Sequence, residues 1–269
     1  MRKRRAGFWL RPWKAFRMRS AIPCVGLIVL AGSLTFIVAP DDEPALDALI
    51  PFPSTFPTVI IDPGHGGRDD GARARGLVEK QLTLDVALRT EKLLRQYNFP
   101  VVLTRRDDSY VGLAERATIG NKVEHSIFVS IHFNQSFSVQ SSGIETFYAS
   151  EKISPEAEWN WMGFFSKPAP AGTDNGETLA GYIQAALILR TDLPNRGIRP
   201  RPLHVVRHTR SPAVLVECGF MSNAIEARLM SNEPYRELLA RAIAEGILTF
   251  EKSRPHPGGA PAQFAQKLR

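Results

Sequence analysis

The chain has few cysteines. Only Cys24 and Cys218 occur among 269 residues, and Cys24 lies within an apolar stretch near the amino terminus. Cys218 is therefore alone in the rest of the chain, so no disulfide can form there and a fold held together by disulfides is excluded. We expect Cys218 to be a small buried residue beside the end of a strand.

The chain also lacks an excess of positive charge outside its first residues. The net charge of +7 comes from 34 basic and 27 acidic residues, but residues 2–19 hold eight of the basic ones. Removing those eight leaves 26 basic against 27 acidic side chains, a net charge of −1, so no nucleic-acid binding is expected. Apolar residues make up 43% of the chain, which is typical of one globular domain with appendages.

The amino-terminal region has the pattern of a membrane-spanning helix. A basic segment, residues 1–19, precedes an uncharged apolar stretch, residues 20–40, and acidic residues follow at once. About 20 apolar residues can cross a bilayer, and the charge order predicts an amino terminus in the cytoplasm and a body outside the cytoplasmic membrane. We favour an uncleaved transmembrane anchor over a cleaved signal segment, because Val38-Ala39-Pro40 is a poor cleavage site.

The rest of the chain reads as a linker, a domain and a tail. Residues 41–57 hold four prolines and indicate a linker, and residues 253–269 indicate a disordered tail. Residues 58–252 alternate strand and helix patterns. Strands are expected at Thr58–Asp62, Val101–Thr104, Ser126–His132, Gly143–Ala149, Leu203–Arg207 and Ala213–Glu217, and helices at Gln81–Tyr97, Val111–Glu124, Leu179–Leu189 and Tyr235–Phe250. This predicts an α/β fold with a mostly parallel twisted sheet of about six strands and helices on both faces.

One stretch of the domain fits no regular element. Residues 150–177 are long for a connection and carry two tryptophans, Trp159 and Trp161, and two phenylalanines, Phe164 and Phe165. Long loops inside compact domains are usually functional or disordered, and so many aromatic residues argue against plain disorder.

Four polar residues stand out because of where the strands and helices place them. His65 follows the first strand within a glycine-rich turn, His132 and Glu217 close two apolar runs, and Glu79 precedes the first helix. Ligands of open α/β sheets bind at the carboxyl ends of strands, so parallel strands would bring these residues to one edge. Each has an ordinary explanation by itself: a structural histidine, or a helix-start acid favoured by the dipole. Glu217 is harder to explain that way, because burying an unpaired carboxylate is costly.

A second histidine pair has a weaker case as a metal site. His204 and His208 are four residues apart, which on a helix would place both on one face. Pro202 and the pair Val205-Val206 favour a strand there, so we expect no metal role.

Several motifs together resemble one family. The motifs are Ile61-Asp62-Pro63-Gly64-His65-Gly66-Gly67, Gly76-Leu77-Val78-Glu79-Lys80-Gln81-Leu82-Thr83-Leu84-Asp85, Leu103-Thr104-Arg105, Phe128-Val129-Ser130-Ile131-His132-Phe133-Asn134, Asn195-Arg196-Gly197-Ile198 and Pro212-Ala213-Val214-Leu215-Val216-Glu217-Cys218-Gly219-Phe220 with Ser222-Asn223. In this order they resemble the zinc-dependent N-acetylmuramoyl-L-alanine amidases, the Amidase_3 family of cell-wall hydrolases. The resemblance runs from about Thr58 to Phe250.

The resemblance implies a set of roles. His65, Glu79 and His132 would bind Zn²⁺, and Glu217 would be the catalytic residue. The substrate would be peptidoglycan, cut between the lactyl group of N-acetylmuramic acid and L-alanine. Some family members carry an inserted helix that shields the zinc until a partner moves it, so a protein activator is one expectation. Residues 150–177 would then be autoinhibitory, with Glu156 or Glu158 reaching the metal; an aromatic wall for substrate and a plain surface loop are the alternatives.

The chemistry of the residues agrees with these roles. Two histidines and a carboxylate leave one tetrahedral position for water, whose pKa zinc lowers to about 7. Glu217 would take the proton of that water and pass it to the leaving amine. Another zinc-dependent wall peptidase, such as a carboxypeptidase, and a non-catalytic wall-binding regulator stay as alternatives. We expect a monomer that acts in the cell envelope, held to the membrane by its amino-terminal segment.

Overall fold

The computed structural model describes residues 56–150 and 175–254. Residues 1–55, 151–174 and 255–269 lie outside the described residues. The predicted cytoplasmic segment and anchor therefore fall outside them, as do nearly all of the linker and most of the insert and tail. Among the described helices, none combines the length and the apolar character that crossing a membrane requires.

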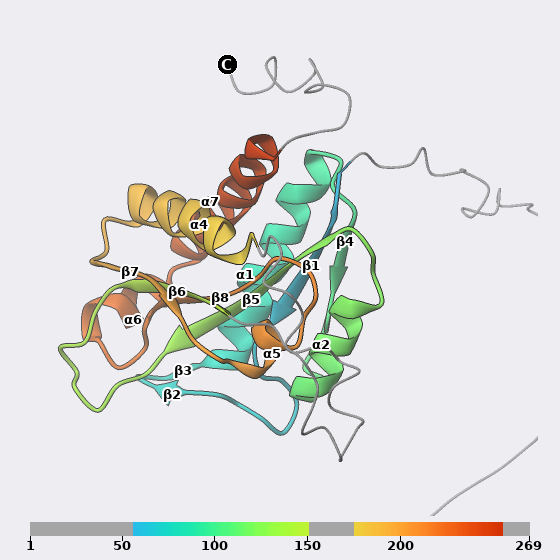
Figure 1. Cartoon of the computed structure of the whole chain (residues 1–269). Helices are drawn as coiled ribbons and strands as arrows, with labels where there is room; N and C mark the ends of the chain where they lie inside the picture. The colour runs from blue at the N-terminus through green and yellow to red at the C-terminus, as the bar shows by residue number, and fades with distance from the viewer. Residues whose placement is uncertain (1–55, 151–174, 255–269) are drawn as a thin grey trace, which may run out of the picture. The chain divides into compact units, whose positions relative to one another are not determined.

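A six-stranded mixed sheet forms the centre of the domain (Figure 1). In spatial order its strands are β4 (Val101–Leu103), β1 (Thr58–Pro63), β5 (Ser126–Asn134), β8 (Ala213–Phe220), β6 (Ile144–Tyr148) and β7 (Asn195–Pro200). The first four run parallel, β6 runs antiparallel to β8, and β7 is parallel to β6. The predicted mostly parallel sheet of about six strands is confirmed. The sequence did not predict that β6 and β7 run opposite to the other four strands.

Helices cover both faces of the sheet, as predicted. The long helices are α1 (Glu79–Gln96), α4 (Gly176–Thr191) and α7 (Glu233–Ser253), and the shorter ones are α2 (Leu113–Asn121), α5 (His204–Arg207) and α6 (Ala224–Ser231). In Figure 1 α4 and α7 lie side by side on one side of the sheet, and α2 and α5 lie together on the other. A two-stranded hairpin, β2 (Arg73–Ala74) and β3 (Leu77–Val78), leads into α1.

The alternation of side chains along the strands builds two apolar layers. In β1, Val59 and Ile61 belong to the larger core, which also includes residues of α1, α4 and α7, whereas Ile60 belongs to the smaller core with Val205 and Val206 of α5. Successive side chains of a strand point to opposite faces, so a strand covered on both sides is apolar throughout. The apolar runs seen in the sequence are therefore strands buried on both faces.

Two predicted features differ in the structure, and β7, α6 and the β2–β3 hairpin were not predicted. Leu203–Arg207 was predicted to be a strand, which is wrong: His204–Arg207 form α5, where the His208 amide donates to the His204 carbonyl at 3.0 Å. The short Val205-Val206 pair buries itself against the sheet in a single helical turn, so its β-branched composition misled the prediction. Strand β8 also runs past Glu217 to Phe220, so Glu217 lies inside the strand and not at its end.

Candidate functional site

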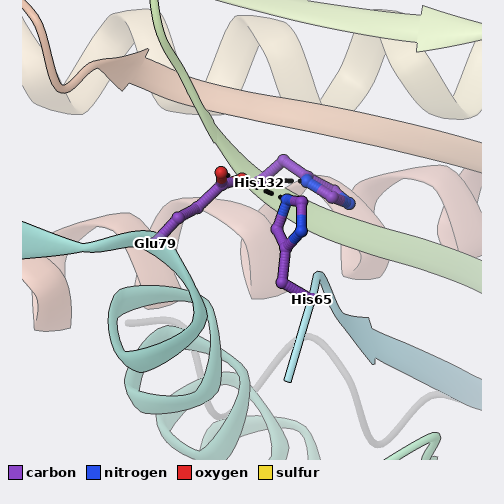
Figure 2. Close-up of side chains that lie close together, drawn as sticks. All are labelled: His65, Glu79 and His132. Carbon is purple, nitrogen blue, oxygen red and sulfur yellow. Dashed lines mark hydrogen bonds and ion pairs between the residues drawn. The ribbon is translucent and has the colours of Figure 1, made fainter. Parts of the chain in front are cut away.

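Three of the four predicted site residues meet at the carboxyl edge of the parallel strands. His65 lies two residues beyond β1, His132 lies near the end of β5, and Glu79 is the first residue of α1. Figure 2 shows the three side chains pointing toward one another. His65 has a φ of 61°, the left-handed conformation that a sharp turn after a strand requires and that non-glycine residues seldom adopt.

The carboxylate of Glu79 joins the two histidines. Its Oε2 lies 3.1 Å from His65 Nε2, and its Oε1 lies 2.9 Å from His132 Nδ1 (Figure 2). One ligand atom from each residue lies within 4.8 Å of the others. Two imidazole nitrogens and a carboxylate oxygen thus lie close enough together to hold one metal ion, as the sequence predicted.

Backbone amides fix the orientation of the Glu79 side chain. The amide of Phe133 donates to Oε1 at 3.1 Å, and the amide of Ala72 donates to Oε2 at 2.8 Å. Burial by itself would raise the pKa of Glu79, but the hydrogen bonds and charges of His132 and His65 outweigh it and lower the pKa far below its usual range. Glu79 is therefore ionised and ready to bind a cation at neutral pH.

A second carboxylate, that of Asp69, contacts the ring nitrogen of His65 that faces away from Glu79. His65 Nδ1 lies 2.9 Å from Asp69 Oδ2, while Oδ1 of Asp69 accepts from the Gly71 amide at 3.1 Å. Burial lowers the pKa of His65, but Glu79 and Asp69 together raise it above its ordinary value. A carboxylate on one ring nitrogen directs the other nitrogen at the metal. Asp69 was not predicted from the sequence, although an acid four residues after a histidine in a glycine-rich turn was the available signal.

Two glycines leave the space that the cluster occupies. A Cβ atom at Gly64 would meet the ring of His132, and one at Gly71 would meet the Glu79 carboxylate and the His65 ring. Larger residues at either position would displace the three converging side chains. The glycine-rich sequence around His65 is thus explained by close packing as well as by the turn.

Glu217 lies beside this cluster. It is the register partner of His132 on the neighbouring parallel strand, so both side chains emerge on the same face of the sheet. Its Oε2 is buried and accepts no hydrogen bond within the described residues. Burial, followed by the charges of Glu79 and Glu145, raises the pKa of Glu217 well above its usual range. A carboxyl group that readily holds a proton next to three potential ligands is a candidate acid and base.

A buried arginine holds the turn that carries His65. Arg116 Nη1 donates to Asp62 Oδ1 at 2.7 Å and to the Pro63 carbonyl at 2.6 Å, and its Nη2 donates to the His65 carbonyl at 2.6 Å. Both members of the Arg116–Asp62 ion pair are almost fully buried. Arg105 adds a bond from Nη2 to the Gly64 carbonyl at 2.8 Å. These guanidinium groups offset the unfavourable backbone of the turn.

The donor set fits zinc. Two histidines and one glutamate with a free fourth position are a common ligand set of catalytic zinc sites. The three ligand atoms already converge, the Glu79 carboxylate is ionised, and Asp69 fixes one of the imidazoles. His204 and His208, whose rings stack with their centres 4.0 Å apart, belong to no candidate metal group among the described residues.

Comparison with known proteins identifies the family. The profile of Amidase_3, described as N-acetylmuramoyl-L-alanine amidase, matches residues 59–249. This chain belongs to the Amidase_3 family. It is thus a hydrolase of the N-acetylmuramoyl-L-alanine amidase family, and the predicted resemblance is confirmed.

Individual proteins are also similar to this chain in sequence or in structure. YqiI of Bacillus subtilis, described as uncharacterized, is 33% identical over 193 residues, which cover 72% of this chain and 84% of that protein. The amidase LytC of the same organism is 31% identical over 193 residues, which cover 72% of this chain but only 35% of LytC. The crystal structure of an N-acetylmuramoyl-L-alanine amidase from Clostridium difficile 630 matches with a TM-score of 0.64 and 33% identity, over 75% of this chain and all of that one.

Proposed function

We propose that the protein is a zinc-dependent amidase that hydrolyses the bond between N-acetylmuramic acid and the L-alanine of the stem peptide. The observation that supports this most is that one ligand atom each of His65, Glu79 and His132 lies within 4.8 Å of the other two. These three side chains would hold the zinc ion. When bound, zinc would polarise the amide carbonyl and make a water molecule acidic enough to attack at neutral pH.

Glu217 is the proposed catalytic residue. Its carboxyl group lies beside His132 on the same face of the sheet, and its buried Oε2 has no hydrogen-bond partner within the described residues. A carboxyl group with a raised pKa can accept a proton from the attacking water and donate it to the leaving nitrogen. Asp69 would keep His65 oriented throughout, and Arg116 would hold the turn behind it.

We also propose the arrangement of the whole chain. Residues 1–19 would lie in the cytoplasm, residues 20–40 would anchor the protein in the membrane, and residues 41–57 would link the anchor to the amidase domain, residues 58–252. The domain would then act on peptidoglycan outside the cytoplasmic membrane, as a monomer. The insert, residues 150–177, would either shield the metal until an activator binds or form an aromatic wall for substrate.

The products of wall digestion test the function. An amidase releases stem peptides that begin with a free L-alanine amino group and leaves muramic acid without peptide. Mass spectrometry of purified peptidoglycan after digestion, with and without a chelator, should show these products only in the absence of chelator. Release of terminal D-alanine would instead identify a carboxypeptidase. A wall left unchanged both by the zinc-loaded protein and by a zinc-loaded variant that lacks Trp159–Phe165 of the insert would identify a non-catalytic wall binder. Either result overturns the proposal.

A further inference from the structure

A row of charged side chains crosses the sheet beside the candidate metal site. His132 of β5 pairs with Glu217 of β8, and Glu217 pairs with Glu145 of β6. Directly paired residues present their side chains to the same face. The row continues to the edge strand β7, where Arg196 Nε lies 3.5 Å from Glu145 Oε2. The candidate catalytic residue thus shares one face of the sheet with a charged pair to which the proposed chemistry gives no role.

The carboxylate of Glu145 lies near two arginine side chains. Its side chain is buried, and Asn134 Nδ2 donates to its Oε1 at 2.9 Å. Its Oε2 faces two guanidinium groups, because Arg199 Nη1 lies 3.9 Å away in addition to Arg196. Neither distance is short enough for a strong hydrogen bond. Within the described residues, Glu145 therefore faces two positive charges, and Glu217 on the neighbouring strand is a second carboxyl group beside it.

Within the described residues, few hydrogen bonds engage the guanidinium group of Arg196. Its Nε is buried without a hydrogen-bond partner in the described parts of the chain, and its Nη1 reaches the Ser142 carbonyl only at 3.4 Å. Its central carbon lies 4.9 Å from the ring centre of Phe220, and the side chain is 34% exposed. Because Nε is buried and faces Glu145, a ligand could meet only the two terminal nitrogens, Nη1 and Nη2. Two terminal N–H groups are suited to a planar carboxylate, which accepts two parallel hydrogen bonds.

Building on the amidase activity proposed above, we propose that Arg196, assisted by Arg199, forms an anion subsite for a carboxylate of the stem peptide. The residue that follows L-alanine in the stem peptide has an α-carboxyl group that is either free or amidated. Neighbouring strands lie about 4.8 Å apart, and an extended peptide advances about 3.5 Å per residue. A peptide whose scissile carbonyl lies at Glu217 and which runs across β6 toward β7 would therefore bring this carboxyl group near Arg196. The subsite would favour substrates in which this α-carboxyl group, on the peptide that leaves, is free over substrates in which it is amidated.

A matched pair of substrates tests the subsite. Two muramoyl tripeptides are needed, γ-linked through the second residue and differing only in whether its α-carboxyl group is free or amidated. Zinc-loaded wild-type protein should cleave the free acid with the higher kcat/KM. Arg196→Gln should lower kcat/KM for the free acid by about 10- to 100-fold and leave the amide within about twofold, because charge-assisted hydrogen bonds are lost only for the acid. Arg196→Lys should fall in between, because it keeps the charge and loses the planar fork.

Arg201→Gln is the matched control. Arg201 lies just beyond β7, is exposed, and packs over Phe147 with its guanidinium carbon 5.6 Å from the ring centre. This variant removes an equal charge from the same stretch of chain and should leave the ratio of the two substrates unchanged. Equal losses for acid and amide in Arg196→Gln would show that Arg196 only neutralises Glu145, and the subsite would be refuted. No loss for the acid would refute it as well.

A binding measurement separates this inference from the amidase activity. Calorimetric titration of the same two tripeptides into the zinc-loaded Glu217→Gln variant requires no cleavage. The free acid should bind at least about tenfold more tightly than the amide, and adding Arg196→Gln should remove that difference. If the wild type cleaves neither tripeptide, the amidase proposal fails while this titration still reports on the subsite. Equal affinities for the two tripeptides would contradict the subsite whatever the activity.

Discussion

His132 and Glu217 are register partners on the adjacent parallel strands β5 and β8. The pairing places a candidate metal ligand and the candidate catalytic carboxyl group side by side on the same face of the sheet, on rigid backbone. Residues 85 positions apart in the sequence are thereby held at about the distance of one strand spacing. The geometry depends on the sheet and not on a loop, so substitutions of either side chain should leave the fold intact.

Replacing Glu217 should separate metal binding from catalysis. Glu217→Gln keeps the size of the side chain but cannot accept a proton, so kcat should fall by about 10²- to 10⁴-fold. Zinc content should stay at the wild-type value, because none of His65, Glu79 and His132 changes. Release of dye from labelled peptidoglycan measures the first quantity and elemental analysis the second. Wild-type activity in this variant would remove Glu217 from the mechanism.

Glu217 should also make the stability of the metal-free protein depend on pH. Its pKa is raised in the folded protein, so the folded state binds its proton more tightly than the unfolded state. The contribution of Glu217 therefore lowers the free energy of unfolding as the pH rises from the ordinary glutamate pKa, about 4.3, toward the pKa of Glu217 in the folded protein. Glu217→Gln should melt at a higher temperature than the wild type at pH 7, and the difference should shrink as the pH is lowered to about 4. A variant that melts lower at pH 7 would show that the ionised carboxylate is not destabilising.

Asp69 should strengthen metal binding without touching the metal. Asp69→Ala removes the carboxylate that holds His65 Nδ1, and zinc affinity should fall by about 10- to 100-fold. Asp70→Ala is the matched control, because Asp70 pairs with Arg73 and Lys80 instead of His65. Competition with a chromophoric chelator measures both affinities. Equal affinities in the two variants would show that Asp69 has no such role.

Arg116 should be among the most costly residues to replace. Arg116→Met leaves the buried Asp62 carboxylate without its partner, so the free energy of unfolding should fall by about 3–5 kcal/mol. Arg190→Met, which removes an exposed pair with Glu245, should cost about 0–1 kcal/mol. Denaturant unfolding of the metal-free proteins gives both values. Similar losses for the two variants would contradict a special role for the buried pair.

Much of the fold and the site could be predicted from the sequence, for physical reasons. The buried parallel strands are continuous apolar runs, and polar residues such as His132 that interrupt them stand out. Strand β7, which begins at Asn195, was missed because an edge strand with two arginines, a glycine and a proline shows no apolar pattern. Asp69 was missed although it follows His65 by four residues in a glycine-rich turn, and Arg116 was missed because nothing local distinguishes it from a surface charge. Their roles follow from contacts that only the folded chain creates.

The position of a bound zinc ion tests the central claim most directly. The protein crystallised with Zn²⁺ and measured at the zinc absorption edge should show one anomalous peak about 2.0–2.2 Å from His65 Nε2, His132 Nδ1 and an oxygen of Glu79. Glu217 should lie beside that peak without ligating it. A map with no peak at this position in zinc-saturated protein, or with zinc bound by other residues, would contradict the account.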